Sequence, residues 1–253
     1  MRRDLFVMGL LVALLVVLLA QLGFFDAERL SRGMSNLATF SREAFPPDTG
    51  ILPMAANALL ETVQIALAGT ILGFLVALPL GLLGTSTLSP TPVILLVRLL
   101  VATTRTIPAL VWAILFVIVV GLGPLAGTLG LAIYTVGYLA KLYAESFEGV
   151  DPEVIEAVRG AGASRVQLAR FVLWPEAANS ILSQLMFMVE YNIRASSILG
   201  FVGAGGIGFY MQVYVQTLQY QRLMAILILL LGVVLCMDLL SAWVRRHYLL
   251  TAR

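Results

Sequence analysis

The most charged stretch of the sequence, Glu145–Glu176, lies between long apolar runs and has the residue types of an ordered docking segment. Asp151 followed by Pro152 is typical of a helix start, because an aspartate accepts a backbone hydrogen bond there and proline fits the first turn. Glu153 and Glu156 then fall in the turn where the helix macrodipole favours acidic side chains. The pattern predicts a short helix that begins at Pro152.

The same stretch contains residues that end one helix and begin another. Gly160 and Gly162 break the first helix, and Ser164 can cap a second one that runs to Trp174 and is closed by Pro175. Two short helices joined by a glycine elbow have a shape suited to insertion into a groove on another protein. The segment is therefore predicted to bind another protein rather than to catalyse a reaction.

A second group of candidates lies inside the apolar runs, where charged side chains are rare and usually face protein or water. Glu190 and Arg194 are four residues apart and share a helix face, which predicts either an ion pair that fixes packing or a gate. Arg98 and Arg105 either anchor to lipid headgroups or serve an anionic substrate. Asn192 is a further pathway candidate.

The run from Gly203 to Gly208 matches the G-x-G-x-x-G pattern of dinucleotide sites. Such a site needs a preceding strand in a βαβ unit, whereas this run follows a predicted membrane helix. We interpret it as a backbone break near the pore mouth, where irregular chain is tolerated if it lines a cavity. The glycines concerned are Gly203, Gly205, Gly206 and Gly208.

Composition excludes several classes of function. Of the 253 residues, 60% are hydrophobic and 12% are charged, against about 45–50% and about 25% in soluble domains. Lipid is therefore the expected solvent, and the net charge of +2 without a clustered basic face excludes a nucleic-acid partner. Cys236 and His247, each the only residue of its type, cannot supply a usual zinc site or most nucleophile pairs. No catalytic or metal residue is predicted.

The apolar runs predict an all-α integral membrane protein with about six transmembrane helices. The first run, Leu5–Phe25, is expected to be retained, since no small-x-small cleavage site follows it. Asp26–Gly50 has apolar residues at helical spacing, which predicts a helix on the membrane surface that Pro46 and Pro47 end. The other predicted spans are Ala56–Leu83, Val93–Val120, Leu125–Tyr143, Ala177–Leu199 and Leu223–Val244.

Two features inside these spans bear on packing. Gly69 and Gly73 form a small-xxx-small pair, which either allows two helices to approach closely or is chance among 22 glycines. Pro108 predicts a kink or restart within Val93–Val120.

Arginine placement predicts the orientation, because cytoplasmic loops carry an excess of basic residues. With six spans, three arginine groups fall on one side, which places both termini and the charged stretch in the cytoplasm of a bacterium, with the chain crossing the inner membrane several times. The groups are Arg2 and Arg3; Arg159, Arg165 and Arg170; and Arg245, Arg246 and Arg253.

The charged stretch resembles the EAA loop of ABC importer permeases. Glu156-Ala-Val158, Gly162 and Val172-Leu-Trp-Pro175 match its Glu-Ala-Ala, Gly and Ile-x-Leu-Pro elements with the same spacing throughout. Further stretches look most like phosphonate importer permeases of the methionine-permease-like group. They are Arg105–Trp112, Val120–Pro124, Glu190–Arg194 and Ser197–Gly208.

This resemblance implies a type I ABC importer fold with five core helices, the first predicted helix being an extra one. Residues 1–50 would form a helix plus an interfacial segment, and 51–253 the permease domain with its coupling loop at 145–176. The coupling helix would dock into an ATPase subunit through five residues: Glu156, Ala157, Gly160, Gly162 and Pro175.

The resemblance also implies partners and an activity. Two ATPase subunits, which bind ATP and Mg, an external substrate-binding protein, a second permease copy as a homodimer and membrane lipid would surround the chain. The chain itself would be no enzyme, since no phosphate-binding loop is present. It would import phosphonate or a related phosphorus oxyanion. The alternatives are a permease for another small solute, or a secondary transporter using intramembrane carboxylates such as Glu190 and Asp238.

Overall fold

The structure is a computed structural model that describes residues 2–244, 246 and 247, and every regular element in this part is helical. Arg245 and Arg253, two residues that support the predicted orientation, lie outside the described residues. The α-helices are α1 Arg2–Gln21, α2 Ala27–Ala44, α3 Leu52–Leu83, α4 Thr91–Thr106, α5 Ala109–Val120, α6 Pro124–Glu148, α7 Pro152–Gly160, α8 Arg165–Leu168, α9 Trp174–Leu199, α10 Ile207–Gln216 and α11 Tyr220–Val244. Short turns of other helix types are η1 Thr49–Ile51, η2 Ala169–Leu173 and η3 Gly200–Val202.

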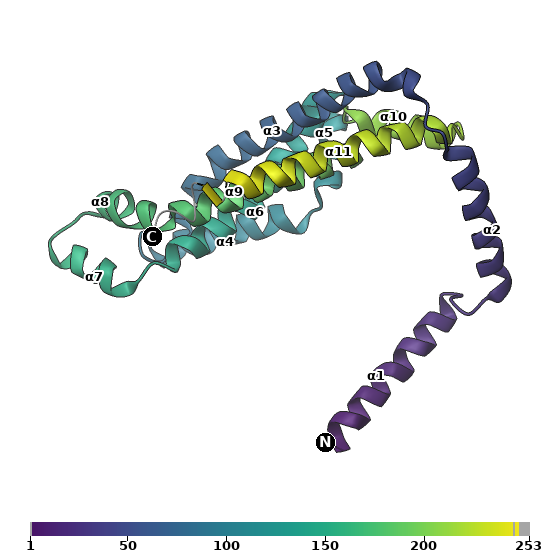
Figure 1. Cartoon of the computed structure of the whole chain (residues 1–253). Helices are drawn as coiled ribbons and strands as arrows, with labels where there is room; N and C mark the ends of the chain where they lie inside the picture. Colours follow the sequence, from purple (N-terminus) through teal and green to yellow (C-terminus); the bar gives the residue numbers. More distant parts are fainter. Residues whose placement is uncertain (1, 245, 248–253) are drawn as a thin grey trace.

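Seven helices, α3–α6 and α9–α11, form an elongated bundle with α7 and α8 projecting from one end (Figure 1). The short helix α10 lies at the opposite end of the bundle. The last turns of α11, drawn in yellow, lie at the same end as α7 and α8 (Figure 1). The predicted docking segment is thus separated from the glycine-rich break by the length of the bundle.

The number of spans depends on how two bent pairs of helices are counted. Four helical segments are long and apolar enough to cross a membrane, and six spans result if each bent pair is one span. The α4–α5 pair bends by 88° and the pair formed by Arg165–Val202 and α10 bends by 50°. The expectation of about six transmembrane helices therefore agrees with the structure.

The bend at Pro108 is much sharper than a kink. Ile107 is extended, with φ −84° and ψ 122°, because the ring of a following proline disfavours helical backbone at the preceding residue. The predicted span Val93–Val120 is consequently two helices, α4 and α5, set almost at right angles.

The first two helices extend away from the bundle (Figure 1). Among the residues with described side chains, nearly all of α1 is exposed. The Asp26 side chain caps α2 by accepting a hydrogen bond from Arg29 N, and the helix ends before Pro46 as expected. Its contact with the bundle includes the edge-on rings of Phe40 and Tyr220, whose centroids are 5.1 Å apart. The position of α2 on a membrane surface stays a prediction.

Helix α6 is the centre of the bundle and packs against α3, α4, α5 and α9. Glycines permit this crowding. A Cβ at Gly69 would lie 2.8 Å from the Cβ of Leu131, and one at Gly73 would lie 2.5 Å from the Cβ of Thr135. Small residues let membrane helices approach closely and gain dispersion contacts. Of the two readings left open for this pair, close helix approach is confirmed.

Candidate functional site

The docking segment begins and bends as its sequence predicts. Asp151 Oδ1 accepts a hydrogen bond from Glu153 N at 2.9 Å, so it caps α7. At the other end, Gly162 adopts φ +87°, a conformation that costs other residues about 1–2 kcal/mol. Gly162 N donates to Arg159 O and Ala163 N donates to Val158 O, which is the Schellman pattern of a helix C-terminus. Gly162 is therefore the residue that turns the chain.

The second half of the segment corrects one expectation. Ser164 and Gln167 form a capping box that begins α8, but Pro175 does not close this helix. Instead η2 is a π-helical turn in which Trp174 N bonds to Ala169 O, and Pro175 lies in the first turn of α9. Because a π turn shifts the backbone hydrogen bonds by one residue, the chain continues past a proline without a break. The segment is therefore continuous with α9.

One face of the segment packs into the bundle and the other is open. Ile155, Leu168, Val172 and Leu173 are buried in the main apolar core, whereas Val166 and Phe171 are 76% and 66% exposed. The open side also has a hollow of about 260 Å³ lined by Val158, Ala161, Gly162, Ala163, Gln167 and Phe171.

Exposed apolar patches are typical of protein interaction sites, and the docking role of this open side stays a prediction. The predicted coupling residues Glu156, Ala157 and Gly160 are exposed on α7. Pro175 is exposed as well, at the start of α9.

Polar contacts connect this segment to the bundle. Arg159 Nη2 donates to Thr87 O, in the turn between α3 and α4, at 3.3 Å. Glu148, the last residue of α6, accepts from Ser86 N at 3.0 Å in the same turn and from Arg98 Nη2 at 2.7 Å. The end of α6 thus joins α4 and the α3–α4 turn.

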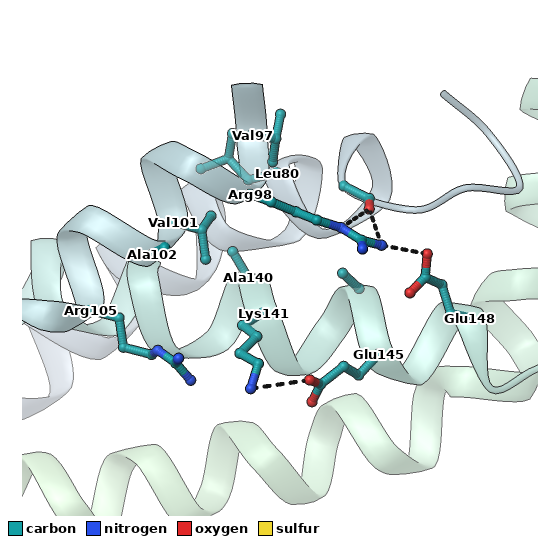
Figure 2. Close-up of a pocket in the computed structure, with 12 residues that line it drawn as sticks. Leu80, Val97, Arg98, Val101, Ala102, Arg105, Ala140, Lys141, Glu145 and Glu148 are labelled. Carbon is teal, nitrogen blue, oxygen red and sulfur yellow. Dashed lines mark hydrogen bonds and ion pairs between the residues drawn. The ribbon is translucent and has the colours of Figure 1, made fainter. Parts of the chain in front are cut away.

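Arg98, Arg105 and Lys141 line one cavity of about 240 Å³ between α4 and α6 (Figure 2). Arg98 is paired with Glu148, and Lys141 Nζ lies 3.2 Å from Glu145 Oε1. The guanidinium of Arg105 extends to the same side as the Lys141 ammonium (Figure 2). Folding brings Lys141 into one cavity with these two arginines of α4, which are distant from Lys141 in sequence.

The other charged candidates lie on the α9–α11 side of the bundle. Arg194 Nη1 is 2.7 Å from Glu190 Oε1 and 3.9 Å from Asp238 Oδ1, so the predicted pair is present with a third member. Asn192 is fully buried and donates to the hydroxyls of Thr70 and Thr135 at 2.8 and 2.9 Å. Asn192 therefore links α3, α6 and α9 inside the protomer.

The glycine-rich run is a backbone break, as expected. Gly203, Gly205 and Gly206 all have positive φ, and Gly208 packs directly against Ser197 O. This break separates α9 from α10, and Gly203 O accepts from Gly123 N at 2.8 Å. The three positive φ values explain the need for glycine at these positions.

Sequence analysis missed the groups that cap α10. Glu61 Oε1 accepts from Gly206 N at 2.9 Å, and Thr62 Oγ1 accepts from Ile207 N at 2.8 Å. Both residues belong to α3, so a carboxylate and a hydroxyl on another helix satisfy the free N–H groups of the α10 N-terminus. The only available sequence signal was an acidic residue within an apolar run.

A helical bundle with membrane-spanning segments, internal ion pairs, a glycine break and a predicted docking segment at one end is the arrangement expected of a membrane transport subunit. A family model described as "Binding-protein-dependent transport system inner membrane component" matches residues 77–249. The chain belongs to this family of permeases.

The chain is similar to the phosphite transport system permease protein PtxC of Stutzerimonas stutzeri, with 35% identity over 92% of this chain and 86% of that protein. The phosphate-import permease protein PhnE of Mycolicibacterium smegmatis is also 35% identical, over 75% of this chain and 36% of that protein.

Among solved structures, the MetNI methionine ABC transporter in an inward-facing conformation aligns with a TM-score of 0.69 and 25% identity, over 79% of this chain and 98% of that chain. The predicted type I ABC importer fold and the resemblance to ABC importer permeases are confirmed.

Proposed function

We propose that this chain is the membrane-spanning permease of an ATP-driven importer for a small phosphorus oxyanion such as phosphite or a phosphonate. The observation that carries the proposal is the docking segment, which is anchored in the core by Ile155 and Leu168 and leaves Val166 and Phe171 open. The substrate class is supported by the relatives, whose names specify phosphite and phosphate.

The proposed assembly has two copies of this chain, two ATPase subunits that bind ATP and Mg, and an external binding protein. Residues 51–253 form the permease domain, and residues 1–50 form a separate helix and interfacial segment. Both termini lie in the cytoplasm; for the C-terminal side this is supported by the end of α11, which lies at the same end of the bundle as α7 and α8 (Figure 1). Lipid surrounds the apolar outer face.

In the proposed mechanism, ATP binding draws the ATPase subunits together and moves the two docking segments. Glu156, Ala157 and Gly160 contact the ATPase from α7, Gly162 sets the angle of the elbow, and Pro175 begins the rigid helix that transmits the movement. Because η2 joins α8 to α9 without a break, a displacement of the segment reaches the bundle. Access to the pathway then alternates between the two sides of the membrane.

A secondary transporter would need a carboxylate able to bind an ion or a proton in a cavity. Glu190 and Asp238, the candidates from sequence, both face Arg194. Glu61 is engaged in capping α10. These engagements favour the ATP-driven importer over this alternative.

The test is reconstitution of this chain with its ATPase and binding protein in sealed vesicles. Labelled phosphite or methylphosphonate should accumulate only when ATP is present on the ATPase side, and an inactive ATPase should abolish uptake. The chain purified alone should hydrolyse no ATP. Uptake without ATP, driven by an ion gradient, would show that the chain is a secondary transporter.

A further inference from the structure

The surface of the bundle divides into an apolar part and a polar, aromatic part. Exposed positions on α4 and α11 are occupied largely by leucines, as expected for contact with lipid: Leu95, Leu96, Leu99, Leu231, Leu235 and Leu239. The accessible stripe along α6 is different, because Tyr134, Tyr138, Lys141 and Glu145 recur on one face of the helix. Polar stripes inside a membrane usually face a water-filled path or another protein.

Aromatic rings extend this stripe from α6 to α9. Tyr134 stacks on Tyr191 with centroids 5.7 Å apart, and Tyr138 stacks on Phe187 at 6.3 Å. The four rings form a continuous wall, because Tyr134 also stacks on Tyr138 and Phe187 on Tyr191. Arg105 of α4 lies close enough to interact electrostatically with Tyr134. Arg105, which lines the cavity of Figure 2, is thus the residue that connects the cavity to the aromatic wall.

Arg105 differs from the other cations of the spans in its charge balance. Arg98, Lys141 and Arg194 each have a carboxylate partner at 2.7 to 3.2 Å. Within the described part of the chain, Arg105 has neither a salt bridge nor a side-chain hydrogen bond. Arg105 also lies roughly 21 Å along the helix from Thr91, the first residue of α4, at about 1.5 Å per residue.

We propose that Arg105 is the ligand of a phosphoryl oxyanion on the transport path, bound in the cavity that Arg105 lines together with Arg98 and Lys141. This inference rests on the proposed function and adds the residues that meet the substrate. A guanidinium binds two oxygens of such an anion at once. The two acids of the cavity neutralise Arg98 and Lys141, so the charge of Arg105 remains available to an incoming anion.

The phosphoryl group bound by Arg105 can belong to a free oxyanion or to the headgroup of an anionic lipid. The proposal names the phosphoryl group that both ligands share, and the experiment distinguishes the two ligands. Arg105→Gln and Arg105→Lys are compared with wild type in the reconstituted complex. Arg42→Gln is the matched control, because Arg42 is exposed on α2, away from the cavity.

In the transport arm, Arg105→Gln should lower the maximal rate of phosphite uptake about 10- to 100-fold, the equivalent of one lost charged hydrogen bond. The half-saturating concentration should stay unchanged, because the external binding protein captures the ligand first. Arg105→Lys keeps the charge but not the planar fork, so it should recover part of the rate. Arg42→Gln should behave as wild type, and complex yield should be equal for all four proteins.

In the binding arm, the purified complex in neutral detergent is mixed with phosphite, and the ³¹P line width is measured without ATP. Broadening with wild type that is lost in Arg105→Gln assigns the site to the free oxyanion. Unchanged uptake together with loss of co-purified phosphatidylglycerol assigns it to a lipid headgroup. If Arg105→Gln equals wild type in uptake, in phosphite binding and in lipid content, the assignment of Arg105 is wrong.

The two proposals can fail separately. If wild-type vesicles accumulate neither phosphite nor methylphosphonate, the proposed function fails, while the ³¹P and lipid measurements still test Arg105. If wild type transports phosphite and Arg105→Gln does so equally well, only the assignment of Arg105 fails.

Discussion

The charged residues within the spans are distinguished by their ion-pair partners. Arg194 has two such partners, Glu190 on α9 and Asp238 on α11. Such a group fixes the packing of two helices, because separating the charges inside a membrane is unfavourable. A role in holding α9 against α11 follows for Arg194, in contrast to the open guanidinium of Arg105.

Paired removal tests this structural role. Glu190→Gln and Arg194→Gln should each lower the yield of folded complex, because the first leaves Arg194 with only the longer contact to Asp238 and the second leaves both acids without their cation. The loss should be smaller than the roughly 3–5 kcal/mol typical of a fully buried pair, since the Arg194 side chain is 43% exposed. The double change should recover much of the yield and of the uptake, because the one acid that it leaves without a cation, Asp238, is 45% exposed. A double mutant that folds well but does not transport would instead place Arg194 on the substrate path.

At the scale of elements, one glycine decides the shape of the docking segment. Gly160 and Gly162 are only two residues apart, yet Gly160 is the last residue of α7 and a Cβ there would meet open space. Gly162 has φ +87°, so any side chain there is strained even though space is available. The two positions therefore separate a backbone effect from a surface effect.

Gly162→Ala should destabilise the elbow by about 1–2 kcal/mol, the cost of left-handed backbone for an L-residue. Gly160→Ala should leave the elbow intact, because it introduces a better helix former at a helical position. Hydrogen exchange of the Ala163 amide, which bonds to Val158 O, reports the elbow directly. Equal protection in the two variants would contradict the role given to Gly162. Uptake measured alongside would show whether loss of the elbow uncouples transport.

A second element-scale contact links the start of α11 to the chain before α3. The backbone N–H of Gly50 and then the Arg222 guanidinium hold the pKa of Asp48 below its usual value of 3.8. A carboxylate with a lowered folded pKa stabilises the folded state above 3.8, and this contribution is lost as the pH falls through the folded value. Acidification from about pH 6 to below about pH 3 should therefore lower the protection factors of the amides around residues 45–52, that is, their exchange rates relative to the intrinsic rates at the same pH. Asp48→Asn should remove the pH dependence; an identical profile in both proteins would exclude this contact as its cause.

The sequence predicted those helix caps and turns whose hydrogen bonds join residues that are close together in the chain. Asp151, Gly162 and Ser164 act within a few residues of themselves, so their caps and turns were predictable. The hydrogen bonds of Glu61 and Asn192 were not predictable, because their partners lie on other segments, 145 residues away for Glu61 and 57 and 122 residues away for Asn192. The continuation of the helix through Pro175 was also not predicted, since a π turn has no distinct pattern in a single sequence.

At the scale of the whole molecule, the docking segment and the cationic cavity are joined by a short series of contacts. Arg159 of α7 bonds to Thr87, the neighbouring Ser86 bonds to Glu148, and Glu148 bonds to Arg98 in the cavity wall. Spatial continuity by itself does not demonstrate coupling. It does identify Glu148 as the residue where the α3–α4 turn, α4 and α6 meet, and hence where coupling is most open to a single substitution.

Glu148→Gln should therefore separate ATP hydrolysis from transport. The amide can still accept the hydrogen bond from Ser86 N, but it cannot balance the charge of Arg98, so the end of α6 is held less firmly. We expect the phosphite accumulated per ATP hydrolysed to fall by about 2- to 30-fold, which corresponds to a coupling loss of about 0.5–2 kcal/mol. ATP hydrolysis stimulated by the binding protein should persist, because the docking face on α7 and α8 is unaltered.

Glu28→Gln, which removes an acid from an exposed pair on α2, is the matched control and should leave the ratio of phosphite accumulated to ATP hydrolysed unchanged. A wild-type ratio for Glu148→Gln would mean that the movement reaches the cavity by another route, for which the unbroken helix from α8 through η2 into α9 is the structural candidate.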